Sequence, residues 1–219
     1  MTIDTRILTV VNKGPDLTTL AKNRFNLQVA KSVAKGDQLI FNIVWQSKVL
    51  APRINVKWKP IYGLNWTMDL PSEGVEVTLG GNWKQCDPGQ VLDLDETGQW
   101  TQSTSQPVID FLAIGNNNFK SGTDTNGIHI IVGVQNAPGA FDPIFVDPAE
   151  LGPNMSGSYQ PQEQLQWWYE EGMRTSTMIS KNKSDKEVGD YSQPDPKSGT
   201  FAKTSSFTFN TGKWSTTSP

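Results

Sequence analysis

Two aspartates one residue apart, Asp93 and Asp95, carry the most suggestive chemistry in this chain. They lie in the stretch GQVLDLDETGQW, residues 89–100, behind a short apolar run and ahead of a threonine. One carboxylate of such a pair can attack phosphorus while the other protonates the leaving group, with magnesium bridging both. The same pair can begin a calcium loop, or lie on a strand that runs into a turn.

The segment VLDLDET, residues 91–97, resembles the Asp-x-Asp-x-Thr/Val motif of the haloacid dehalogenase phosphatases. That resemblance implies that Asp93 is the nucleophile and Asp95 the general acid, on a parallel sheet with helices between its strands. The flanking sequence lacks amphipathic helices, so the motif is without its structural setting. A carboxylate-dependent hydrolase using Asp93, Asp95, Glu170 or Glu171 therefore stays only as a further alternative.

Calcium binding is the second interpretation of the same pair. Asp93, Asp95, Thr97 and Gly98 occupy the first, third, fifth and sixth places of an EF-hand loop. The twelfth place, which requires a bidentate glutamate, is Thr104, and no helices flank the loop. An irregular calcium site at Asp93 and Asp95 remains the one metal alternative, and we otherwise expect no cofactor.

The interpretation that we favour for residues 89–100 is a β-hairpin. Alternation places Asp93 and Asp95 on one strand face and two leucines on the other. Residues 96–98, Glu-Thr-Gly, then form the turn before Trp100. Acidic side chains on a solvent-facing strand ahead of a glycine turn need no catalytic role.

The chain contains one histidine, His129, and one cysteine, Cys86. Any Ser-His-Asp mechanism would have to use His129, which lies in the apolar run GIHIIVGV at a position that suits a half-exposed strand residue. No Gly-x-Ser-x-Gly elbow precedes a helix, and the usual zinc ligand sets are excluded. Cys86 cannot form an intramolecular disulfide, and we expect it to be buried. We therefore favour binding over catalysis.

Eight tryptophans and an asparagine-rich segment at 114–127 suit a hydroxyl-rich ligand. Indole faces stack on sugar rings, and carboxamides donate to and accept from hydroxyls. Trp45, Trp58 and Trp66 alternate along strands and are expected in the core, whereas Trp83, Trp100, Trp168 and Trp214 are expected to be exposed. The predicted ligand-binding residues are Trp83, Trp100, Asn116, Asn117, Asn118, Trp168 and Glu170.

Period-two alternation of apolar and polar residues is the dominant pattern of the chain. It is clear in FNLQVAKSV (residues 25–33) and RINVKWKP (residues 53–60), and turns rich in glycine and proline separate such runs. The pattern predicts nine to eleven strands in an antiparallel β-sandwich, with a barrel-like arrangement as the alternative. One or two short helices at most are expected, the best candidate being PDLTTLAK (residues 15–22).

Length and charge limit the remaining choices. A chain of 219 residues suits a single all-β domain, 1–219, with a long polar surface loop at 181–205. Nineteen basic and twenty-two acidic residues give a net charge of −3, which indicates no nucleic-acid partner. Without a secretory signal or a membrane-spanning apolar run, we expect a cytoplasmic protein, or one released without a signal peptide. Exposed sheet edges leave a homo-oligomer open.

The composition and expected architecture are broadly similar to those of cytosolic fungal lectins and small cytolysins. The principal hypothesis is a non-catalytic, lectin-like protein that binds a carbohydrate or glycoconjugate. The first alternative is a membrane-acting cytolysin or pore-forming-type toxin, whose partner would be a membrane surface. That alternative requires aromatic residues clustered at one edge and a segment able to refold, for which 181–205 is the candidate.

Overall fold

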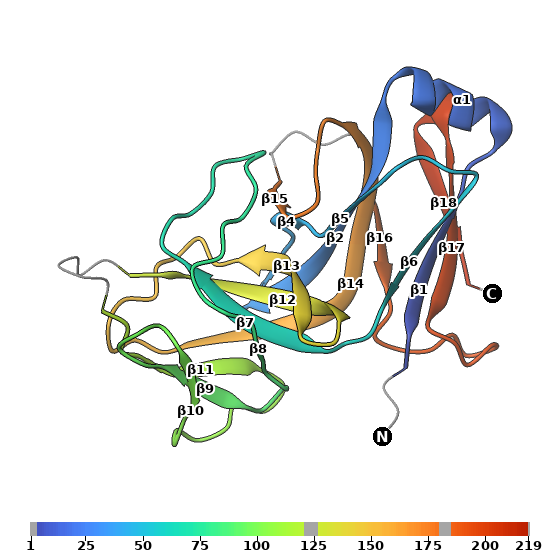
Figure 1. Cartoon of the computed structure of the whole chain (residues 1–219). Coiled ribbons are helices and arrows are strands. Elements are labelled where there is room, and N and C mark those ends of the chain that lie inside the picture. The colour runs from blue at the N-terminus through green and yellow to red at the C-terminus, as the bar shows by residue number, and fades with distance from the viewer. Residues whose placement is uncertain (1–3, 121–126, 180–184, 219) are drawn as a thin grey trace.

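The computed structural model describes residues 4–120, 127–179 and 185–218 of the chain. These residues form a mostly β, sandwich-like fold whose sheets pack as layers, with one α-helix (Figure 1). The all-β prediction is confirmed. The described residues form eighteen short strands, however, and not nine to eleven.

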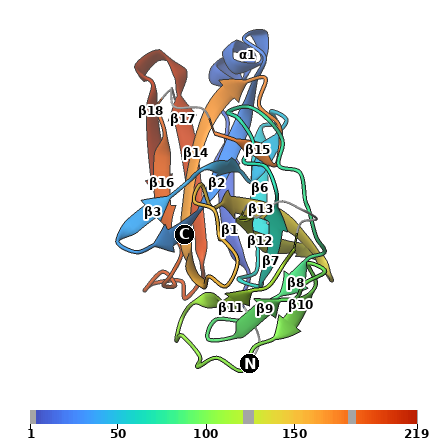
Figure 2. The same ribbon diagram turned by 90° about the vertical axis from the view of Figure 1, so that its left-hand side faces the viewer.

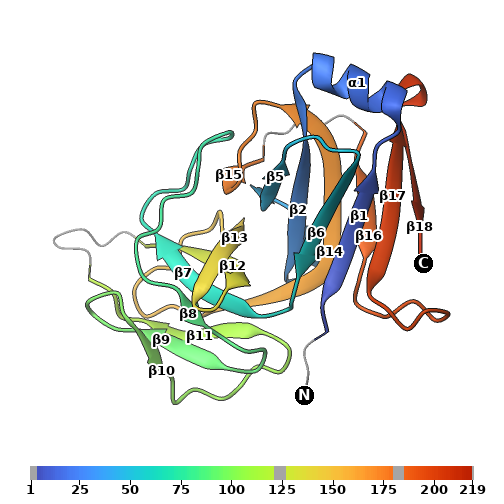
Figure 3. The ribbon, with the colours of Figure 1, turned by 45° about the vertical axis from the view of Figure 1, so that its right-hand side comes forward.

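The first sheet joins the two ends of the chain. Its four strands run in the order β18, β17, β1, β6. Their bounds are β1 (Arg6–Val11), β6 (Arg53–Trp58), β17 (Ala202–Thr208) and β18 (Lys213–Thr217). Strands β1 and β17 pair in parallel, an exception to the predicted antiparallel pattern. The predicted helix is confirmed as α1 (Gly14–Lys22), with Pro15 in its first turn, and lies across one end of this sheet (Figure 3).

The second sheet contains eight strands and is built on the pairing of β2 (Phe25–Lys35) with the fifteen-residue β14 (Gly157–Glu171). Its other strands are β3 (Gln38–Ile40), β5 (Gln46–Lys48), β9 (Val91–Leu94), β10 (Trp100–Gln102), β11 (Leu112–Asn117) and β16 (Glu187–Asp190). The alternation of residues 25–33 predicts that Asn26 and Gln28 face water, but this is wrong for Gln28, which is fully buried, as is Ser32 on the same side. Lys31, on the opposite side with Leu27 and Val29, is buried too. Strand β2 is therefore buried on both faces.

The third sheet has the order β13, β12, β7, β8. Its strands are β7 (Tyr62–Thr67), β8 (Lys84–Gln85), β12 (His129–Ala137) and β13 (Ala140–Val146). The apolar run GIHIIVGV forms most of β12, which lies between β13 and β7 as a central strand. A two-stranded pair of β4 (Ile43–Val44) and β15 (Thr177–Met178) and the short helix η1 (Phe209–Thr211) complete the fold.

A large apolar core lies between the sheets, whose strands Figure 2 shows after a turn of 90° from the view of Figure 1. Trp45, Trp58 and Trp66 belong to it, as predicted, and so does Trp167. The β9–β11 part of the second sheet lies at the end of the molecule away from β17 and β18 (Figures 1 and 3). Residues far apart in sequence thus meet where the three sheets approach one another.

The predicted loop at 181–205 is wrong over part of its length. Residues 187–190 form β16, which pairs with β14, and β17 begins at Ala202. Gly189 allows β16 to pack closely, because a Cβ there would lie 2.9 Å from the Trp167 ring. Residues 181–184 lie outside the described residues.

Candidate functional site

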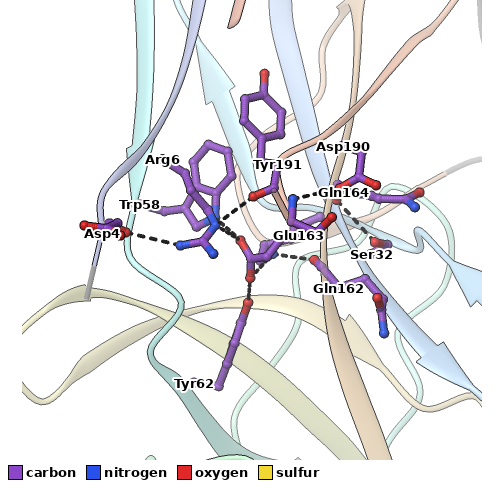
Figure 4. A network of polar contacts seen from close by, with 12 residues as sticks. Asp4, Arg6, Ser32, Trp58, Tyr62, Gln162, Glu163, Gln164, Asp190 and Tyr191 are labelled. Carbon is purple, nitrogen blue, oxygen red and sulfur yellow. Dashed lines mark hydrogen bonds and ion pairs between the residues drawn. The ribbon is translucent and has the colours of Figure 1, made fainter. Parts of the chain in front are cut away.

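The carboxylate of Glu163 is the point at which strands from all three sheets meet (Figure 4). Arg6 Nε from β1 lies 2.9 Å from Glu163 Oε2, and Lys31 Nζ from β2 lies 3.1 Å from Oε1. The indole N–H of Trp58 donates to Oε2 over 2.7 Å, and the hydroxyl of Tyr62 donates to Oε1. We call these five residues the Glu163 cluster.

A bulge in β14 places Glu163 in this position. The β14–β2 register shifts between Pro161 and Leu165, so residues 162–164 leave the ladder with β2, although Gln164 stays paired with Asp190 of β16. Carbonyl groups freed in this way must find other donors when they are buried. Lys31 donates to the carbonyl of Gln162, and Ser32 donates to that of Gln164 over 3.2 Å. The side chains of β2 therefore satisfy the bulge that aims Glu163 inward.

The charges of the cluster are strongly coupled. Burial lowers the pKa of Lys31 to about 8, although the neighbouring Glu163 carboxylate acts in the opposite direction. Burial by itself would raise the pKa of Glu163, but Lys31, the Tyr62 and Trp58 donors and Arg6 together hold it below its ordinary value. Because the carboxylate is surrounded by protein donors, this cluster fixes side chains in place and does not offer itself to a ligand.

A pocket of about 420 Å³ lies beside the cluster and shares Trp58 with it. Two indoles, three carboxamides and a hydroxyl line it: Trp45, Trp58, Gln46, Gln135, Asn136 and Thr5. Lys57 and Lys59 are also part of its wall. These groups come from the residue before β1, the start of β5, β6 and the β12–β13 hairpin, so only the folded chain assembles them. We call this cavity the Trp58 pocket.

The aromatic and polar groups of the Trp58 pocket differ in how they are satisfied. Trp45 and Trp58 meet edge to face at 5.9 Å and are only 2% and 3% exposed, so they supply a closed floor. Gln46 Oε1 is buried without a hydrogen-bond partner. Asn136 donates a hydrogen bond to Asp142 over 2.6 Å. Burial raises the pKa of Asp142, although Asn136, the Lys48 charge and the Trp45 N–H each act to lower it. That indole nitrogen makes no hydrogen bond of good geometry.

The prediction that Trp168 is exposed is wrong. Its indole is fully buried against Ala30 and Val44, and its N–H donates to Glu170 over 2.6 Å. Strict alternation assigns one face of a strand to water, but β14 is covered on both faces here, so Trp167 and Trp168 are both buried. Trp168 in this position cannot stack on a sugar, and Glu170 is occupied in holding it.

The other three tryptophans predicted to be exposed are partly buried. Trp83 packs on Phe141, with ring centroids 5.6 Å apart, and on the backbone of Gly133. Trp100 packs against the main core, and Trp214 stacks on Tyr169 at 5.2 Å. Each ring has a structural role, which leaves at most part of it free for a ligand.

The β9–β10 hairpin is confirmed, with Trp100 paired to Leu94. Asp95 Oδ1 accepts hydrogen bonds from Thr97 N and Oγ1 and from Gln99 N, and these donors hold its pKa below the ordinary value. Asp95 therefore closes the turn, and its Oδ1 is occupied by these three hydrogen bonds. No group of three or more His, Cys, Asp or Glu side chains gathers within the described ranges.

The structure brings the predicted asparagines next to this hairpin. In the parallel β9–β11 pairing, Asn116 lies opposite Asp93 and Asn117 opposite Leu94. Asn117 is buried and donates to the Leu151 carbonyl over 2.8 Å, while Asn116 donates to Asn118. Residues 121–126 of the predicted asparagine-rich segment lie outside the described residues.

The groups considered for catalysis do not form one site. Glu170 and Glu171 lie at the end of β14 that pairs with Asn26 and Phe25, whereas β11, next to Asp93, pairs with the other end. His129 is buried, with Nδ1 2.9 Å from the Asp147 carbonyl, so the half-exposed position expected for it is wrong. Cys86 is buried as predicted, and burial raises its pKa to about 12.

No protein family, curated protein or solved structure matches this chain. Among the described residues, no helix has the length and apolar character needed to cross a membrane. Neither the Glu163 cluster nor the Trp58 pocket was predicted from the sequence. One signal was present, since alternation places Lys31 on the apolar face of β2, between Val29 and Val33.

Proposed function

We propose that this chain is a non-catalytic carbohydrate-binding protein whose ligand lies in the Trp58 pocket. One observation carries the proposal: four separate segments bring two indoles, three carboxamides and a hydroxyl to a single cavity. Binding sites for small polar molecules combine apolar walls with a few polar groups that converge on the ligand. The proposal keeps the ligand class expected from the sequence and moves it to other residues.

Sugar hydroxyls suit the polar groups of this cavity. Gln46 Oε1 lacks a donor, and the carboxamides of Gln135 and Asn136 offer further donors and acceptors. A hydroxyl donates and accepts at once, so it can satisfy mixed amide groups that a purely accepting anion could not. A small rotation of the Gln46 side chain would turn its oxygen toward the cavity, while the indole edges of Trp45 and Trp58 would contact C–H groups of the ring.

The Glu163 cluster supports binding by fixing the pocket floor. Glu163 Oε2 accepts the Trp58 N–H over 2.7 Å, and Lys31 Nζ lies 5.8 Å from the centre of the same ring. A side chain held before the ligand arrives loses little further freedom on binding. Glu163 is therefore assigned as a positioning residue, which acts through Trp58.

A glycan array with labelled protein tests the proposal. The wild type should retain a defined set of glycans, and Gln46→Ala should lower the affinity for them at least tenfold. Trp100→Phe, an aromatic change at a residue of the originally predicted site, is the matched control and should bind like the wild type. A blank wild-type array, or binding that survives Gln46→Ala and Asn136→Ala together, would overturn the proposal.

A further inference from the structure

Three side-chain oxygens gather over Gly115 in β11, at a place separate from the Trp58 pocket. A Cβ built on Gly115 would lie 2.5 Å from Ser103 Oγ, 2.6 Å from Asp93 Oδ1 and 2.7 Å from Ser105 Oγ. Real Cβ atoms essentially never show contacts this short, so any larger residue at this position would force the three side-chain ends to move. The oxygens thus surround a small space that the absent side chain leaves free.

The local backbone explains why these oxygens converge. The parallel β9–β11 register shifts between Ile114 and Asn116, and Gly115 is the additional residue of this bulge. The segment after β10 then folds over the bulge, with Ser105 N–H donating to Ser103 Oγ over 3.1 Å. Asp93 projects from β9 toward the same space.

Asp93 Oδ1 is buried and has no hydrogen-bond partner among the described residues. An unsatisfied buried carboxylate oxygen is costly, and proteins normally give it a donor or a cation. The nearby Asp95 differs in this respect, since its Oδ1 accepts three hydrogen bonds within its own turn. The Asp93 oxygen is therefore the group at this end of the sheet that lacks a positive partner.

We propose that Asp93, Ser103 and Ser105 form a calcium site over Gly115. Calcium prefers oxygen ligands and accepts irregular arrangements at about 2.3–2.6 Å, whereas magnesium demands a near-ideal octahedron at about 2.0–2.1 Å. The ion would lie farther from the backbone than the Cβ position, and the two serines, on a largely exposed segment, would turn to meet it. Water completes the coordination.

A single carboxylate sets the strength of this site. Calcium affinity depends on the number of charged ligands, so we expect a Kd on the order of 10⁻⁴–10⁻³ M. An ion that binds only the folded protein raises its melting temperature as the ion concentration increases. This effect does not depend on whether the Trp58 pocket binds a sugar.

Thermal unfolding and isothermal titration, with calcium chloride and magnesium chloride compared at equal ionic strength, test the site. The wild type should gain several degrees in Tm at about 10 mM calcium, and magnesium should give a smaller shift. Asp93→Asn should weaken calcium binding at least tenfold. Gly115→Ala fills the space without changing the charge and should abolish binding.

Asp95→Asn is the matched control, because it removes a carboxylate charge only two residues from Asp93, at a side chain whose Oδ1 is already held by three hydrogen bonds in its own turn. It should keep the calcium response of the wild type. A wild type that shows neither heat of binding nor a calcium-specific Tm shift would mean that water alone fills the space, and the proposal would fail. Equal calcium binding by Asp93→Asn would also overturn it, whether or not Gly115→Ala folds.

Discussion

The opposite charges of Glu163 and Lys31 compensate each other, which allows both side chains to be buried. Lys31 is completely buried and Glu163 nearly so, and either charge left alone in this position would cost several kcal/mol. The pair also holds neighbouring groups in position, since Lys31 donates a hydrogen bond to the Gln162 carbonyl in the β14 bulge and Glu163 accepts one from the Trp58 indole. Their removal should therefore affect both stability and the shape of the pocket.

Glu163→Gln should lower the free energy of unfolding by about 3–5 kcal/mol, because it leaves the Lys31 ammonium buried without its counter-charge. Urea denaturation at neutral pH measures the change. Glu171→Gln, an exposed change on the same strand, should stay within about 0.5 kcal/mol of the wild type. A loss below about 1 kcal/mol in Glu163→Gln would show that the cluster is not coupled as described.

Acid should reduce the difference in unfolding free energy between the wild type and Glu163→Gln. The pKa of Glu163 is lower in the folded chain than its ordinary value of 4.5, so its contribution to stability is complete above that value. The contribution is lost as the pH falls through the lowered pKa of the folded state. Urea midpoints of wild type and Glu163→Gln should thus begin to converge as the pH falls below 4.5, and a constant gap would contradict the ionic account.

Strands and turns differ in how far the sequence determines them. The β9–β10 hairpin and α1 were predicted correctly, because their turn residues, Asx contacts and helix-start proline act over a few positions. The β14 bulge could not be predicted, since its carbonyls are satisfied by side chains of β2, and Ser32 and Gln164 are 132 residues apart. Trp168 was misplaced for a related reason, because alternation does not reveal that a strand is covered on both faces.

Ser32→Ala tests the bulge as an element. It removes the donor to the Gln164 carbonyl in a fully buried position and should cost about 1–2 kcal/mol of unfolding free energy. Chemical denaturation provides the measurement, with the exposed Ser72→Ala as control. If both variants unfold alike, the bulge does not depend on the hydroxyl of β2.

At the scale of the whole molecule, the tryptophan side chains are directed into the protein interior. Composition correctly indicated that indoles are important, but it could not separate rings that build the core from rings that meet a ligand. All eight lie in the described part of the chain, and each is buried or partly buried. The Trp58 pocket arises only where the segment before β1, the start of β5, β6 and the β12–β13 hairpin meet, so no local pattern could reveal it.

This arrangement predicts that the protein does not permeabilise membranes. The cytolysin alternative requires exposed aromatic side chains at one edge, whereas the tryptophans here pack inward. Dye-filled vesicles of phosphatidylcholine, sphingomyelin and cholesterol should retain their contents at micromolar protein. Dose-dependent leakage would favour the membrane-acting hypothesis over the carbohydrate-binding one.

The most direct test of the proposed binding site follows the indole N–H signals of the eight tryptophans by NMR. The protein would be titrated with the glycan that the array retains best, after single tryptophan-to-phenylalanine changes have assigned the signals. The signals of Trp45 and Trp58 should shift on binding, while those of Trp83, Trp100 and Trp214 stay in place. Shifts confined to Trp83 or Trp100 would contradict the account and return the ligand to the loops first expected from the sequence.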